Sequence, residues 1–144
     1  MFNGALTNSN DFKYLTGVTD IPNDSFKSYS GETFVFPPNV RTIGTHVLDW
    51  GSNTDTTLKT VIIGEHVQSI KDYFCRYRTS MQKVIIYAKN PPADATYIFR
   101  RGTAQDINAT FKIYVPDDSI NAYKSATNWS RYASQYLPLS QLEG

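Results

Sequence analysis

The side chains that could carry chemistry in this sequence are few and scattered. His46 and His66 stand at different positions relative to the apolar segments before them, so stacking those segments does not bring the two rings together. Cys75 is the only cysteine, so neither an intrachain disulfide nor a cysteine-based metal site can form, and a buried, inert thiol is expected. The sequence has no H-x-x-x-H, C-x-x-C or acidic calcium-loop pattern. We therefore expect no metal ion and no cofactor.

Patterns for nucleophilic or phosphate chemistry are also absent. There is no G-x-S-x-G turn, no P-loop and no G-x-G-x-x-G segment. Asp117 and Asp118 could act as paired carboxylates, but they follow Pro116 at the expected start of a helix, where capping explains both. The sequence therefore predicts no catalytic residues and a protein that is not an enzyme.

Two pairs of arginines remain as candidates for contact with a ligand. They are Arg76 and Arg78, on either side of Tyr77, and Arg100 with Arg101. A guanidinium can bind a carboxylate through two parallel hydrogen bonds, so these side chains could contact an acidic glycan or the carboxylates of a partner. Solvated surface charge is the simpler interpretation, and both interpretations stay open.

Composition limits the class of partner. The 144 residues are enough for one domain with its own core, and 14 basic against 13 acidic residues give a formal net charge of +1. A nucleic-acid binder would concentrate basic residues, so we expect no nucleic-acid partner. No apolar run has the length of a membrane span, so no membrane insertion is expected. Residues 1–6 have neither a basic start nor an apolar stretch, so we expect no signal peptide in this chain.

A recurring apolar pattern predicts the elements that must position these side chains. In Leu58–Ile70 a strand pattern ends at Gly64, and a second apolar pair follows it. One unit of this size cannot enclose a core, whereas stacked units can share one. The sequence therefore predicts a stack of short strands. The segments that match all or part of this unit are residues 18–26, 34–43, 81–86 and 113–116.

These units resemble the pattern L-x-x-V-x-I-P-x-x-V-x-x-I-x-x-x-A-F of BspA-type leucine-rich repeats, over about residues 12–142. The resemblance implies an α/β solenoid, a leucine-rich-repeat-like stack of short parallel β-strands in about four units, with a C-terminal helical cap. Its parts would be an N-terminal lead-in (1–16), the solenoid (17–116) and the cap (117–144). The apolar stripe of the cap, expected to pack against the last unit, consists of Trp129, Tyr132, Ala133 and Tyr136.

The sequence also departs from the family pattern. The dipeptides Val47-Leu48 and Phe74-Cys75 stand where the family has Ala-Phe. Residues 49–57 and 93–110 lengthen two loops, and specificity is expected to lie in such loops.

Alternation along the strands separates a core face from an outer face, because successive side chains point to opposite sides. The outer positions are all apolar or aromatic, whereas a solvated strand face usually carries Thr, Lys or Glu. We expect this row to be covered by another copy of the chain or by a partner. The alternative is that the N-terminal arm or the 93–110 loop folds over it. The predicted outer row is Val35, Ile62, Ile85 and Tyr114. The predicted core positions are Phe34, Phe36, Val61, Ile63, Val84, Ile86, Ile113 and Val115.

The resemblance and the lack of catalytic patterns together imply a recognition or assembly module. BspA-type repeats occur in surface proteins of gut bacteria and in proteins of their phages. The first expectation is therefore a structural or receptor-binding appendage of a phage virion, which binds a protein or glycan receptor or neighbouring virion subunits, with homo-oligomers among the possibilities. The alternative is an adhesin domain at the bacterial cell surface, and a minor alternative is an accessory domain of a carbohydrate-active enzyme.

Overall fold

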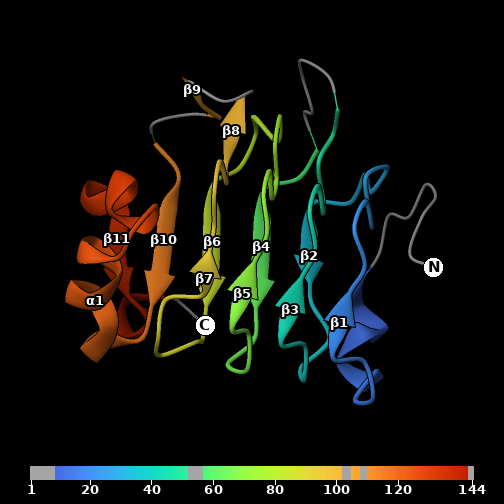
Figure 1. Cartoon of the computed structure of the whole chain (residues 1–144), viewed down its shortest axis with the longest axis horizontal. Helices are drawn as coiled ribbons and strands as arrows, with labels where there is room; N and C mark the ends of the chain where they lie inside the picture. Colours follow the sequence, from blue (N-terminus) through green and yellow to red (C-terminus); the bar gives the residue numbers. More distant parts are fainter. Residues whose placement is uncertain (1–8, 52–56, 102–104, 108–109, 143–144) are drawn as a thin grey trace.

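The computed structural model describes residues 9–51, 57–101, 105–107 and 110–142 (Figure 1). Its short strands form two sheets in which every strand is parallel to its neighbours, together with a small antiparallel hairpin and a C-terminal helix. Part of the predicted lead-in (1–8) and the centre of the predicted 49–57 loop lie outside the described residues. The two sheets are consistent with a parallel-strand repeat.

The larger sheet has five strands in the order β11-β10-β6-β4-β2. Four of them are the apolar segments that the sequence predicts: β2 (Thr33–Val35), β4 (Thr60–Ile63), β6 (Lys83–Ile86) and β10 (Lys112–Val115). They pair in the predicted register, with Val61 opposite both Phe34 and Val84. The prediction of parallel strands is thereby confirmed.

The smaller sheet has strands of two residues each, in the order β1-β3-β5-β7. These strands are β1 (Asp20–Ile21), β3 (Thr42–Ile43), β5 (Ser69–Ile70) and β7 (Ala93–Asp94). Figure 1 shows the arrows of β3, β5 and β7 pointing opposite to that of β10, so the chain runs along one sheet and returns along the other. The sequence indicated an apolar pair in this part of each unit, but not a sheet.

The prediction that residues 93–110 form one long loop is wrong for its first part. Ala93–Asp94 is the last strand of the smaller sheet, paired with β5, and Ile98 and Phe99 are buried in the core. The polar Asp94 lies opposite Ile70, so the apolar signal of the unit is missing at this position. Among the described strands, only the following hairpin, β8 (Arg100–Arg101) with β9 (Gln105–Asp106), departs from the parallel arrangement.

One hydrophobic core contains side chains from both sheets. Strand alternation explains which residues enter it, because every second side chain of β4 and β10 is buried. Cys75 is also buried, as predicted. All eight predicted core residues are buried: Phe34, Phe36, Val61, Ile63, Val84, Ile86, Ile113 and Val115.

A side chain before the first 3-10 helix (Asn10–Tyr14) occupies the free edge of β2. The Ser9 hydroxyl accepts a hydrogen bond from the Val35 amide at 2.9 Å and donates to the Thr33 carbonyl oxygen at 3.2 Å. An exposed strand edge invites pairing with another chain. Ser9 therefore satisfies backbone groups that would otherwise be open at this end of the sheet.

The C-terminal segment packs on the other end of the larger sheet (Figure 1). Its helical parts are three 3-10 helices (Asp117–Ser119, Trp129–Gln135 and Leu139–Gln141) and α1 (Ile120–Ser125). Trp129 and Tyr132 are buried, which confirms the packing role predicted for the aromatic stripe. The cap is not wholly helical, however, because Tyr136–Pro138 forms β11 and extends the sheet beyond β10. Tyr136 thus enters the core from a strand.

The prediction that Asp117 caps a helix is wrong. The helix that begins there has no side-chain cap, and the Asp117 carboxylate instead accepts a hydrogen bond from the Ser140 amide at 3.0 Å. Hydrogen bonds from Ser140 hold the pKa of this carboxyl below its ordinary value. Asp117 therefore joins the start of the cap to its end.

Candidate binding surfaces

The predicted outer row forms on the larger sheet and is one residue longer than expected. Val35 lies opposite Ile62, Ile62 opposite Ile85, and Ile85 opposite Tyr114. Strand β11 adds Leu137 opposite Tyr114. We call these five residues the strand row; neighbouring strands in such a sheet lie about 4.8 Å apart.

The strand row is less exposed than the sequence predicts. Ile85 is only 5% exposed, so its prediction as an exposed side chain is wrong. It lies between Ile62 and Tyr114 in the sheet and is not a member of the shared core. Val35, Ile62, Tyr114 and Leu137 are half-buried. The row is therefore a continuous apolar ridge that is only partly exposed.

Arg78 is not a surface contact, contrary to its prediction. The side chain is fully buried, and its guanidinium donates to the carbonyl oxygens of Leu48 at 2.7 Å, Tyr29 at 2.7 Å and Phe26 at 3.3 Å. It also lies over the Trp50 ring, 4.8 Å from the ring centroid. Arg78 therefore connects turns that are far apart in the sequence and cannot reach a partner.

The other three predicted arginines differ in their access to a ligand. Arg100 is 7% exposed, so a direct contact through most of its side chain is excluded. Arg76 is half-buried, with its Nε 2.9 Å from the Asp49 carboxylate in an ion pair that lacks hydrogen-bond geometry. Arg101 is exposed on the β8–β9 hairpin. Only Arg76 and Arg101 therefore retain a surface position.

A second row of side chains, which the sequence does not predict, lies on the turns after the smaller sheet. Its members are Asp24, His46, Tyr73 and Tyr97, each in the left-handed backbone region. The His46 and Tyr73 rings stack at 4.9 Å between centroids, and the Tyr73 and Tyr97 rings at 5.4 Å. We call these four residues the turn row. Each stands three residues after the end of its strand in the smaller sheet, and that spacing is the signal that could have revealed it.

Backbone hydrogen bonds hold the turn row in register. The amide of Asp24 donates to the carbonyl oxygen of Thr45, that of His46 to Asp72, and that of Tyr73 to Thr96. The turns thus continue the ladder of the strands, which offsets the steric cost of about 1–2 kcal/mol that a left-handed conformation carries for each such residue.

Charged side chains accompany the turn row three residues further along each turn. Lys27 pairs with Asp24 at 2.8 Å, and Asp49 pairs with His46 at 2.5 Å. The guanidinium of Arg76 lies 4.8 Å from the Tyr73 ring centroid. The same relation holds between Arg100 and Tyr97 at 5.6 Å. Each of the two tyrosine rings therefore has an arginine of its own turn beside it.

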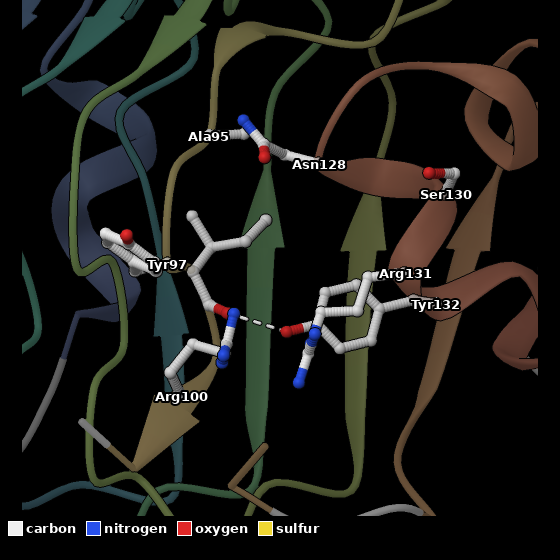
Figure 2. Close-up of a pocket in the computed structure, with 8 residues that line it drawn as sticks. Ala95, Tyr97, Arg100, Asn128, Ser130, Arg131 and Tyr132 are labelled. Carbon is white, nitrogen blue, oxygen red and sulfur yellow. Dashed lines mark hydrogen bonds between the residues drawn. The ribbon is translucent and has the colours of Figure 1, made fainter. Parts of the chain in front are cut away.

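The turn row ends in a depression of about 340 Å³ between the last turn and the cap (Figure 2). The Tyr132 hydroxyl at its base donates to the Ile98 carbonyl oxygen at 2.7 Å, the bond drawn in Figure 2. The surrounding residues are Ala95, Tyr97, Ile98, Arg100, Asn128, Ser130, Arg131 and Tyr132.

One carboxylate organises the charges beside this depression. Asp106 Oδ1 lies 2.9 Å from Arg131 Nε, 3.1 Å from the Tyr132 hydroxyl and 3.9 Å from Arg100 Nε. The hydrogen bond with Asp106 raises the pKa of Arg131. Burial, followed by the charge of Asp106, raises the pKa of the Tyr132 phenol well above its ordinary value, so this hydroxyl stays neutral.

The described part of the chain offers polar contacts and no cluster of metal ligands. Among those residues, no group of three or more His, Cys, Asp or Glu side chains could hold a metal ion. No helix within them is long and apolar enough to cross a membrane. Comparison with protein-family models, with curated proteins and with solved structures finds no match for this chain.

Proposed function

We propose that the chain is a leucine-rich-repeat-like solenoid that serves as a non-enzymatic recognition or assembly module. The strand row is its protein-contact face, and the occupant is a second copy of the chain or a neighbouring subunit of the same assembly. The observation that carries this proposal is the unbroken line of Val35, Ile62, Ile85, Tyr114 and Leu137 across all five strands of the larger sheet.

Register supports the solenoid interpretation. Both parallel sheets and the turn row advance together from one unit to the next, so three separate ladders share the same stacking direction. Stacked repeats that contact only their neighbours have this arrangement, and their open faces are commonly binding surfaces.

The chemistry of the strand row supports a protein contact. None of its five members carries a charge, so two copies can bring their rows together without burying an unpaired ion. Outward-facing Thr60 and Lys83 lie beside the row and supply a polar rim, as protein interfaces usually have. In a twofold contact the strand rows of two copies would pack on each other, because such an interface brings the same surface of both subunits together. An uncharged apolar row with a polar rim suits that arrangement.

The biological setting of the proposal rests on the resemblance to BspA-type repeats. It favours an appendage of a phage virion, with a bacterial surface adhesin as the second candidate. Both settings need a stable module that presents a binding face, and neither requires catalysis.

Paired lysine substitutions on β4 test the contact face. Ile62→Lys places a charge in the strand row, whereas Thr60→Lys places the same charge two residues earlier on the same side of the same strand. We expect the unmodified chain and Thr60→Lys to self-associate in sedimentation equilibrium, and Ile62→Lys to be monomeric with an unchanged circular dichroism spectrum. An unmodified chain that stays monomeric at about 1 mM would refute self-association through this row.

A further inference from the structure

We propose that the depression at the end of the turn row binds a sugar residue of a glycan. Tyr97 forms one wall, and Asn128, Ser130 and Arg131 supply the polar contacts. This site lies on the turns and the cap, not on the outer face of the larger sheet, so the inference goes beyond the proposed assembly role and does not depend on it.

The depression exists because the stack of rings stops at Tyr97. Tyr73 covers one side of the Tyr97 ring at 5.4 Å, and the cap residues Asn128–Tyr132 stand across the depression from it. Tyr97 remains 39% exposed. The stacked rings behind it fix its orientation, so a ligand that packs on it does not need to order a mobile side chain.

Asn128 presents an acceptor to the depression. Its Nδ2 donates to the Asp94 carbonyl oxygen at 2.6 Å, which fixes the orientation of the amide. Figure 2 shows the Asn128 oxygen on the side of its amide that is nearer to the labelled Arg100 and Tyr132. The backbone of Asn128 is left-handed, with φ of 70°, and asparagine tolerates that conformation better than most residues.

Arg131 presents a donor to the depression, and Asp106, which is not part of its lining, supports that side chain. Their hydrogen bond at 2.9 Å holds the guanidinium in place, and the Arg131 side chain is still 40% exposed. Ser130 adds an exposed hydroxyl from the same helix, and Figure 2 places Ser130 and Arg131 on one side of the depression. The opening is therefore bordered by a guanidinium donor, a hydroxyl group and an amide oxygen that accepts.

This arrangement fits hydroxyl groups better than a free anion. A sugar hydroxyl both donates and accepts hydrogen bonds, so it can use the Asn128 oxygen and the Ser130 hydroxyl as well as the Arg131 guanidinium. A sulfate or a fully ionised phosphate group only accepts, so it would leave the Asn128 oxygen without a partner. The C–H groups of a sugar ring can pack on the exposed part of the Tyr97 ring, beside the Arg100 guanidinium, which lies 5.6 Å from the ring centroid. A volume of about 340 Å³ is at the lower end of the range for small-ligand sites.

Binding of the full chain to an array of neutral and acidic saccharides, followed by calorimetry with the best ligand, tests the inference. We expect Tyr97→Ala to weaken that binding by about tenfold or more, since loss of one packed aromatic contact commonly costs at least that much. We expect Asn128→Gly to weaken it by a smaller factor, because glycine keeps the left-handed backbone and removes only the amide.

Tyr87→Ala is the matched control, since Tyr87 is 45% exposed and does not border the depression. It should leave saccharide affinity unchanged, as should Ile62→Lys, which tests the strand row separately. Inorganic phosphate is a further probe, and tighter binding of phosphate than of any saccharide would overturn the assignment. So would an array with no bound saccharide, or affinity that Tyr97→Ala and Asn128→Gly both leave intact while thermal melting shows folded protein.

Discussion

Replacing Arg78 with alanine should destabilise the fold more than replacing any of the exposed arginines. The buried guanidinium donates hydrogen bonds to the carbonyl oxygens of Leu48, Tyr29 and Phe26. A hydrogen bond to a charged group contributes about 1.5–3 kcal/mol, but the cation also loses its hydration when it is buried, which offsets part of the sum. Truncation would leave these buried carbonyls without this donor and open a cavity. We expect a net loss of about 3–5 kcal/mol in the free energy of unfolding.

Urea denaturation followed by far-ultraviolet circular dichroism measures this loss. Arg101→Ala is the matched control, because Arg101 is exposed, and it should change the free energy of unfolding by less than about 0.5 kcal/mol. Arg78→Lys keeps the charge but lacks the planar guanidinium that reaches several carbonyl oxygens. Its loss in the free energy of unfolding should therefore lie between those of Arg78→Ala and Arg101→Ala. Equal free energies of unfolding for Arg78→Ala and Arg101→Ala would refute the structural role of Arg78.

Three other perturbations test the core, the cap and one titrating group. Val61→Ala should lower the free energy of unfolding by about 2–4 kcal/mol in urea denaturation, because Val61 is fully buried between Phe34 and Val84; a loss below about 0.5 kcal/mol would contradict its core position. Deletion of residues 117–144 should give insoluble or molten protein that binds a hydrophobic dye, since it exposes the end of the core; cooperative melting at the temperature of the full chain would contradict this. Asp117 has a pKa below its ordinary 3.8 in the folded chain, so its contact with Ser140 stabilises the fold above that pH and is lost as the pH falls through the folded pKa. Asp117→Asn should therefore lose less stability on acidification below pH 4 than the unmodified chain, and identical acid profiles would argue against the contact.

Strand alternation made the larger sheet predictable. In β4 the buried Val61 and Ile63 stand on either side of the outward-facing Ile62, and Gly64 follows the strand. Both the alternation and the glycine that ends the strand can be read from the sequence. The smaller sheet has strands of only two residues, such as Thr42–Ile43, and two residues cannot show a period. Its pairing is visible only when the stacking is known.

Two features of the turns had no local signal. Tyr73 and Tyr97 adopt a left-handed backbone, for which sequence rules favour glycine or asparagine, so the turn row was not expected. Backbone hydrogen bonds between turns and stacking of the rings hold them there. The sequence placed Arg78 with Arg76 in a basic loop, and nothing local separates the buried residue from the half-buried one.

The sequence predicts the register of the strand row but not how far each of its side chains is exposed. Its register follows from the alternation of each strand, so Ile62, Ile85 and Tyr114 were predicted to line up, and they do. The burial of Ile85 depends on packing that the alternation of its own strand does not show. Leu137 was missed because Tyr136–Pro138 follows a helix and lacks the repeat pattern of the other strands.

Cross-linking through the strand row tests the central proposal most directly. Ile62→Cys places a thiol in the row, while the natural Cys75 is buried and should not react. Sheets that pack face to face lie about 10 Å apart, which is too far for a direct disulfide, so a thiol-specific bismaleimide that spans about this distance should join two copies of Ile62→Cys into a covalent dimer. Lys27→Cys, which places a thiol on the turns, is the control and should stay largely monomeric. Equal yields of dimer from the two variants, or none from Ile62→Cys, would contradict the strand row as a contact face.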